Sequence, residues 1–238
     1  MFTPKTLSFL RSLKRNNKRE WFHERREQYE AHCRQPMITV IERLAEDFRS
    51  FAPDMLADPK VSLFRQFRDT RFSDDKTPMK THLAATFPSR TLGRMNGAGL
   101  YFEIAPGWVW IGGGLWRPDT SQLQLVRDHI VDNQRELEAI VKSPRFKKLG
   151  GLQGDRMTRV PRGYAKDHPA AGYLQHRQFI AFREEPAAFA SAPQFYKELK
   201  GTLEAIVPLV RFLNAPLIAS YSSSPSGSQV FHSASTQR

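Results

Sequence analysis

The chain has 238 residues, 40% of them hydrophobic, with a formal net charge of +12 and an isoelectric point near 10.1. This composition excludes a chain that is disordered throughout, and the aperiodic Gly and Pro exclude collagen-like and low-complexity classes. Cys33 is the single cysteine, which excludes an intramolecular disulfide or a cysteine-based metal cluster and favours a reducing, cytoplasmic location. No run approaches the ~20 uninterrupted apolar residues of a membrane span, so we expect no membrane partner.

The first 51 residues predict three helices. Thr3, followed by proline, is a typical N-cap for the first helix, which two asparagines end. Asn17 with Glu20 three positions later resembles a capping box and predicts a second helix over about 18–33. Apolar residues at helical spacing then predict a third helix over 37–51.

The middle of the chain predicts an antiparallel sheet. Alternating or short apolar runs indicate strands over 61–64, 82–87, 100–104, 108–111 and 179–182. The glycines at 112–114 are expected to end the fourth of these strands or to form a bulge packed by Trp110 and Trp116. They lack the spacing of a P-loop or a dinucleotide fingerprint.

Helical patterns return after the sheet. Asp119 with Gln122 resembles another capping box, and further helices are predicted over 133–141 and from Pro193 to about Leu213. Helices, then strands in hairpin succession, then helices indicate an α+β fold with a mostly antiparallel sheet, on which the N-terminal helices and a C-terminal helix pack.

The chain is expected to form a single α+β domain over 1–217. Residues 218–238 are rich in serine and nearly uncharged, with no core-forming pattern, so we expect a disordered tail there.

The segment 65–80 is the densest functional candidate, with five cationic and three acidic side chains. Guanidinium groups bind phosphate or carboxylate bidentately, and Asp69 between two arginines would have a lowered pKa and orient them. If the segment is extended, Arg65, Phe67, Asp69 and Arg71 share one face. The predicted anion-binding residues here are Arg65, Arg68, Asp69, Arg71, Lys76 and Lys80. The alternative is an ion-pair network that ties a long loop to the helices.

Four groups of residues form a recognisable set of motifs: Arg65–Phe72 with Asp75–Pro78, Asn16–Asn17 with Trp21–Phe22, Gly112–Pro118, and Pro161–Tyr164 with Asp167–Pro169. Together they resemble the motifs of a bacterial family called domain of unknown function 2461 (DUF2461). The resemblance covers about residues 2–217 and implies a compact, cytosolic protein with no established activity. Members usually have tyrosine where this chain has Met79, so no role of that hydroxyl carries over.

Two smaller groups extend the list of candidates. Arg117 stands just before a predicted helix N-terminus, where an anion is favoured. Arg162, Tyr164 and His168 form a second cluster, and Asp167 beside His168 offers general acid–base chemistry if both face one substrate. The alternative for His168 is a turn restrained by the following proline; an approach to the 65–80 segment would favour the functional reading.

Three classes of function remain. The first, which we favour, is binding of an anionic small molecule; whether the protein is an enzyme stays undecided, and no catalytic residue or cofactor is assigned. The second is a nucleic-acid-binding module that uses the basic segment 142–183, where ten Lys and Arg alternate with aromatic residues. The third is a non-catalytic structural or partner-binding protein. The seven histidines form no pair with metal-ligand spacing, so no metal site is predicted.

Overall fold

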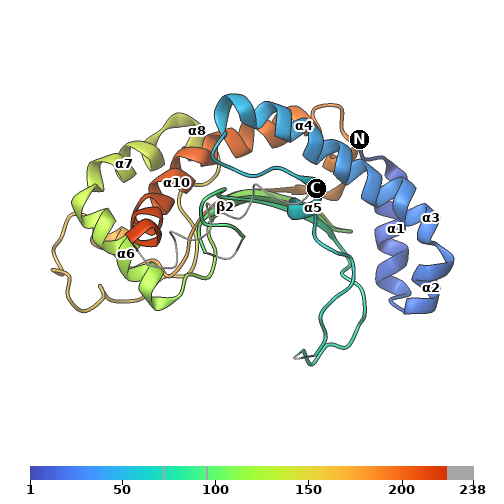
Figure 1. The fold of residues 1–238 in the computed structure, drawn as a ribbon, viewed down its shortest axis with the longest axis horizontal. Helices are drawn as coiled ribbons and strands as arrows, with labels where there is room; N and C mark the ends of the chain where they lie inside the picture. Colours follow the sequence, from blue (N-terminus) through green and yellow to red (C-terminus); the bar gives the residue numbers. More distant parts are fainter. Residues whose placement is uncertain (72, 95, 224–238) are drawn as a thin grey trace, which may run out of the picture.

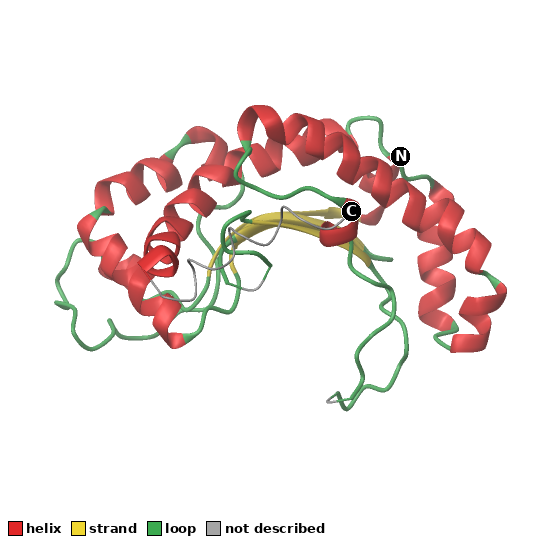
Figure 2. Cartoon of the chain, in the orientation of Figure 1, coloured by secondary structure: helices red, strands yellow, loops and turns green. Residues whose placement is uncertain are grey.

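The computed structural model describes residues 1–71, 73–94 and 96–223. Its centre is an antiparallel sheet of four strands in the order β1 (Leu83–Pro88), β2 (Gly99–Ile104), β3 (Trp108–Leu115) and β4 (Phe179–Pro186). The sheet is arched. Long helices cover its convex face, whereas its concave face carries no helix in Figures 1 and 2. The fold is therefore α+β with an antiparallel sheet and with helices from both ends of the chain, as predicted.

The N-terminal helices are α1 (Pro4–Arg15), α2 (Arg19–Glu24), α3 (Arg26–Tyr29), the π-helix η1 (Glu30–Arg34) and α4 (Gln35–Phe51). The first and third predicted helices are confirmed. The second is interrupted, because Arg25 leaves helical geometry with φ −115°. The predicted capping box at Asn17 is wrong, since Lys18 is the N-cap and the Asn17 side chain bonds elsewhere.

The strand predicted over 61–64 is also wrong. The short helix α5 (Pro59–Ser62) replaces it, because the Asp58 side chain accepts a hydrogen bond from the Lys60 backbone N–H at 2.8 Å and Pro59 suits the first helical position. An isolated bridge between Leu63 and Ala85, with a hydrogen bond from the Phe64 N–H to the Ala84 carbonyl at 3.1 Å, joins this segment to β1.

β3 does not end at its glycines. The strand continues to Leu115, and Gly113 pairs with Leu100 on one side and Ala181 on the other. A strand hydrogen-bonded to neighbours on both sides tolerates residues that would be poor strand formers alone. The expected break or bulge at 112–114 is therefore wrong.

The later helices are α6 (Thr120–Asp132), α7 (Gln134–Lys142), α8 (Pro144–Lys147), α9 (Ala171–Leu174), the 3-10 helix η2 (Ala187–Ser191) and α10 (Phe195–Ser223). The capping box between Asp119 and Gln122 is confirmed, with the Gln122 N–H donating to Asp119 at 2.9 Å.

α10 is longer than expected. It passes through Pro208 and Pro216 and runs to Ser223, so residues 218–223 are helical and the predicted tail boundary is wrong there. The rest of the predicted tail, 224–238, lies outside the described residues.

α10 is not identified by the requirement for about 20 uninterrupted apolar residues in the sequence. By length and composition it could cross a membrane, although polar residues interrupt its apolar run. Of its most apolar window, 56% is buried, and the helix packs against β2, β3, α4 and α6 as a core helix.

Alternation along the strands separates the two faces of the sheet. On β2, Leu100, Phe102 and Ile104 are fully buried against the helices. Tyr101 and Glu103 point to the concave face, as the sequence pattern predicts. The concave face therefore carries the aromatic and polar side chains of the sheet.

Candidate functional site

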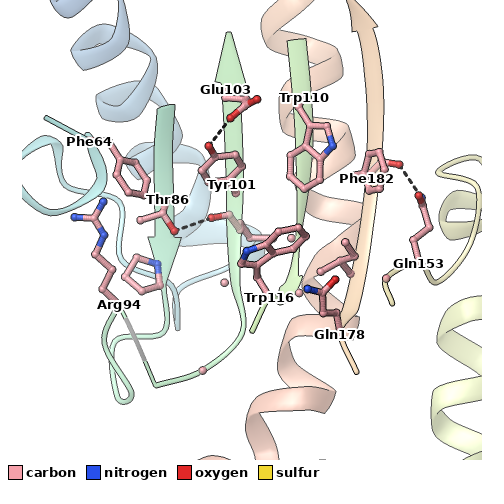
Figure 3. Close-up of a pocket in the computed structure, with 18 of the residues that line it drawn as sticks. Phe64, Thr86, Arg94, Tyr101, Glu103, Trp110, Trp116, Gln153, Gln178 and Phe182 are labelled. Carbon is pink, nitrogen blue, oxygen red and sulfur yellow. Dashed lines mark hydrogen bonds between the residues drawn. The ribbon is translucent and has the colours of Figure 1, made fainter. Parts of the chain in front are cut away.

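The concave face of the sheet holds a cavity of about 820 Å³ (Figure 3). All four strands line it, together with Phe64, Arg94 from the β1–β2 connection, and the segment 153–155 beside β4. This size and the mixture of aromatic and polar lining are typical of small-molecule sites.

Aromatic rings form a row across the floor of the cavity. The Trp110 ring stacks on Phe182, with ring centroids 4.7 Å apart and an interplanar angle of 26°. Tyr101 meets Trp110 edge-on at 5.5 Å, and Phe64 meets Tyr101 edge-on at 6.2 Å. Since ring faces attract planar groups and cations, the row offers a stacking surface that reaches from β1 to β4.

Glycines of β3 make room for this surface. A Cβ at Gly112 would lie 2.7 Å from the Trp110 ring and 2.7 Å from the Phe182 Cβ. Gly114 has φ +124° and lies too close to the Phe179 carbonyl for any side chain. The glycines at 112 and 114 therefore let the Trp110 ring and the β4 backbone lie close to β3, and they belong to a strand and not to a phosphate-binding loop.

Two cations lie over Phe64 at the β1 end. The Arg94 Cζ is 4.0 Å and the Lys80 Nζ 4.5 Å from the ring centroid. Burial lowers the pKa of Arg94; burial, with the nearby charges of Arg94 and Arg65, lowers that of Lys80. Among the described residues neither forms an ion pair, so no carboxylate of that part of the chain offsets their charge. This end of the cavity favours an anion.

Glu103 is a carboxylate of the cavity lining whose position is held by two hydrogen bonds. Its two oxygens accept hydrogen bonds from the Tyr101 hydroxyl at 2.6 Å and the Trp108 indole N–H at 2.8 Å. Burial and the adjacent Glu103 raise the pKa of Tyr101. Burial lowers the pKa of the neighbouring His82. The charge of Lys80 lowers this pKa further, whereas the charge of Glu103 raises it.

Side-chain amides and a carboxylate occupy the β4 end. The Gln153 amide N–H group donates to the Leu149 carbonyl at 3.0 Å and the Phe182 carbonyl at 3.2 Å. The Gln178 side-chain oxygen is 3.5 Å from the Asp155 backbone N–H. Within the described ranges, the Gln153 oxygen, the Gln178 NH₂ and the Asp155 carboxylate make no hydrogen bond, and all three residues line the cavity.

The predicted anion-binding segment 65–80, called the arm below, projects from the sheet edge in Figure 1. Its two halves are joined by hydrogen bonds from Arg68 N–H to the Pro78 carbonyl at 2.9 Å and from Lys80 N–H to the Gln66 carbonyl at 2.8 Å. The Asn17 side chain both donates to the Met79 carbonyl, at 2.9 Å, and accepts from the Met79 N–H, at 3.0 Å. The N-terminal helices therefore anchor the base of the arm.

Two ion pairs within the described part of the arm engage four of its eight charged side chains. Arg68 pairs with Asp75, and Arg71 binds both oxygens of Asp69, at 2.8 and 3.0 Å. These hydrogen bonds lower the pKa values of Asp69 and Asp75 to about 2. Asp69 thus orients Arg71 as expected, and Lys76 donates to a backbone carbonyl of the arm at 3.1 Å. These contacts match the predicted alternative in part: both ion pairs lie within the arm, whereas the side chain of Asn17, and not an ion pair, joins the arm to the N-terminal helices.

The two cations at the base of the arm face different hollows. Lys80 lies over the Phe64 ring, which lines the sheet cavity, but Lys80 itself lines a hollow of about 420 Å³ together with Asp69 and Asp75. Arg65 lines a smaller cleft of about 320 Å³ against the N-terminal helices, together with Phe67 and Lys60. Of the predicted arm residues, Lys80 is therefore the one that the structure brings to the aromatic row.

Arg117 does not line the cavity, although Trp116 before it does. It has φ +119°, a conformation that side chains other than glycine rarely adopt, and its side chain is exposed.

The second predicted cluster lies far from the arm, on the loop at the opposite end of the molecule in Figure 1. Arg162 is exposed. The Tyr164 hydroxyl donates to Asp128 at 2.7 Å, and burial with that contact raises its pKa to about 12. The His168 Nδ1 accepts the Ala170 N–H at 3.0 Å, which is the turn geometry expected as the alternative.

Sequence reasoning missed the residues that define the cavity. No local sequence pattern marks Arg94 as a binding residue, because it stands in a connection between strands and tertiary structure alone brings its side chain over Phe64. The alternation that places Tyr101 and Glu103 on one face did contain a signal, since it extends to Trp108 and Trp110 across the hairpin.

Comparisons with known proteins add a family and nothing further. A protein-family model described as "Conserved hypothetical protein (DUF2461)" matches residues 5–212. No curated protein and no solved structure matches the chain. The residues that the structure describes contain no group of three or more His, Cys, Asp or Glu placed to hold a metal ion.

Proposed function

The chain belongs to the DUF2461 family of conserved hypothetical proteins, whose description carries no activity, and we propose that it binds a small phosphate- or carboxylate-bearing ligand in the sheet cavity. Arg94 and Lys80 hold the anionic group, and the aromatic row holds the body of the ligand. The observation that supports this most directly is that Arg94, which lines the cavity, and Lys80, which lies over the same Phe64 ring, form no ion pair with any described residue.

The cavity supports this function better than the arm does. Arg71 would have to leave a bidentate pair with Asp69 before it could bind another anion, and Arg68 would have to leave Asp75. Arg94 and Lys80 carry no such competitor. The arm's own ion pairs favour a structural role for it, which is the third class considered above.

The proposal concerns binding. Glu103 lines the cavity and His82 lies beside it, so the same ligands are also to be assayed for turnover. Product formed from a bound ligand, and lost in Glu103→Gln, would extend the function from binding to catalysis.

A thermal-shift and calorimetry panel of nucleotides, sugar phosphates and dicarboxylates tests the proposal. At least one anion is expected to stabilise the wild type, and Arg94→Ala and Lys80→Ala to weaken that binding about tenfold or more, since charge-assisted hydrogen bonds contribute ~1.5–3 kcal/mol. Arg135→Ala and Lys14→Ala remove exposed cations outside the cavity, the arm and the 142–183 segment and serve as matched controls. Failure of every anion to stabilise the wild type contradicts the proposal, as does binding that Arg68→Ala abolishes and Arg94→Ala leaves intact.

A nucleic-acid-binding function through 142–183 is the second candidate. Part of the positive charge of this segment is already paired with carboxylates, because Arg183 pairs with Glu185 and Glu198, and Arg145 lies 3.7 Å from Glu204. Exposed cations that support it are Lys147, Lys148, Arg159, Arg162, Lys166 and Arg177. Binding of an oligonucleotide that weakens steeply with salt, and that Lys147→Ala with Lys148→Ala reduces, would favour this candidate.

A further inference from the structure

The two ends of the sheet cavity differ in their chemistry. At the β1 end, Arg94 lines the cavity and Lys80 lies over the same Phe64 ring, and both side chains carry positive charge and hydrogen-bond donors without acceptors. At the β4 end, Gln153 and Asp155 offer acceptors and Gln178 offers both an acceptor and donors. Figure 3 shows Arg94 and Phe64 on one side of the strands and the two glutamines on the other.

The distance between the ends sets the size of the ligand. β1 and β4 are separated by three strand spacings, which is about 14 Å at ~4.8 Å each. Between them lie the stacked Trp110 and Phe182 rings. Trp116, 55% exposed, stands in front of the strands in Figure 3 and adds a further aromatic ring to the cavity lining. A matching ligand is elongated, with an anion at one end and a flat ring at the other.

We propose that the ligand is a nucleoside phosphate with an amino-bearing base, its phosphate at Arg94 and Lys80 and its base stacked near Trp110 and Phe182 beside Gln153, Gln178 and Asp155. This inference rests on the proposed function, because it assigns the ligand class of the same cavity.

The polar groups at the β4 end indicate which hydrogen-bonding groups the nucleobase presents to them. A side-chain amide pairs well with the adjacent amino group and ring nitrogen of adenine, since it supplies one acceptor and one donor side by side. The Asp155 carboxylate accepts from an amino group and repels a carbonyl oxygen. Adenine and cytosine present an amino group on that edge, whereas hypoxanthine presents a carbonyl in its place.

Other anions use less of the cavity. A sugar phosphate reaches the cations but leaves the stacked rings and the amides without partners. A dicarboxylate would bring its second negative charge toward Asp155 or Glu103, both of which line the cavity.

The test compares AMP, IMP, adenosine and ribose 5-phosphate by calorimetry on the full chain. AMP is expected to bind about tenfold or more tightly than ribose 5-phosphate, because stacking of one base contributes roughly that much. IMP is expected to bind several-fold more weakly than AMP. In Asp155→Ala, which changes an exposed side chain, AMP and IMP should bind alike, and Trp116→Ala should weaken AMP but leave ribose 5-phosphate unchanged.

The outcomes separate this inference from the proposed function. Equal binding of AMP and ribose 5-phosphate, with loss of both in Arg94→Ala, overturns the nucleotide assignment and keeps the anion site. Equal binding of AMP and IMP to the wild type overturns the amino-edge assignment. Absence of binding by every phosphate overturns this inference, and the proposed function is overturned as well if the dicarboxylates also fail to bind.

Discussion

Gly112 lies directly beneath the indole of Trp110. A Cβ at position 112 would be 2.7 Å from the ring atoms Cη2 and Cζ3, so the absence of a side chain on one residue sets the position of the other. Trp110 in turn stacks on Phe182 and contacts Tyr101, which makes this pair the centre of the aromatic row. The glycine therefore has a specific packing role in the cavity floor.

Gly112→Ala should displace the Trp110 ring and lower the free energy of unfolding by about 1–3 kcal/mol, because overpacking a filled site forces its neighbours to move. Urea unfolding followed by tryptophan fluorescence measures this loss. Gly201→Ala is the matched control, since a Cβ there meets nothing within 4 Å in α10 and alanine favours the helix. Equal stability of Gly112→Ala and wild type would contradict the packing account.

Asn17→Ala should release the base of the arm. The change removes two hydrogen bonds to Met79, each contributing about 1 kcal/mol, and leaves a buried residue without its backbone partners. Hydrogen exchange should quicken at the amides of Arg68 and Lys80, which join the two halves of the arm. Asn16→Ala removes only an exposed bond to Ser12 and should leave exchange there unchanged. Unchanged protection of the arm in Asn17→Ala would show that other contacts hold it.

Stability should fall as the pH is lowered from about 6.5 to about 4, with His176 contributing. His176 is fully buried, its Nε2 accepts from Arg156 at 2.9 Å, and burial with that positive charge lowers its pKa from 6.5 to about 4. In this window the unfolded state binds the extra proton, so acid favours unfolding; above 6.5 both states are neutral and the contribution is constant.

Urea unfolding at several pH values, for wild type and His176→Gln, measures the effect. The pH dependence between 4 and 6.5 should be shallower in the variant, and the imidazole resonance of the wild type should titrate near 4. Titration near 6.5 in the folded protein would be the contrary result.

Arg117→Gly should leave stability equal or raise it by up to about 1 kcal/mol, because glycine adopts a positive φ without strain. Arg117→Ala keeps the strain and removes the same exposed side chain, so it is the control. The comparison is made by thermal unfolding. Greater stability of the alanine variant would mean that the Arg117 backbone is not strained.

The sequence predicted the parts of the fold that depend on local chemistry. Asp119 and Gln122 cap α6 as expected, and the alternation at Tyr101 and Glu103 identified the concave face. Local chemistry also explains one error, because Asp58 and Pro59 are a helix start that the apolar residues after them concealed.

The remaining errors depend on distant partners. Asn17 caps nothing because Met79, 62 residues away, takes both of its hydrogen bonds. The β3 glycines stay in the sheet because strands on both sides pair with them.

The candidate site likewise has features that local sequence reveals and features that depend on tertiary contacts. The charges of the arm were evident in sequence, but their pairing with one another depends on the fold of the arm. Arg94 lies over Phe64, 30 positions away, and no local pattern indicates that contact.

The most direct test of the cavity as the binding site is an amide chemical-shift titration with AMP. We expect the shifts to concentrate on the cavity residues Arg94, Gly99, Gly114, Gln153 and Gln178, and to disappear in Arg94→Ala. Shifts confined to residues 65–77 of the arm, or to the exposed cations of 142–183, would contradict the assignment of the binding site to the concave face of the sheet.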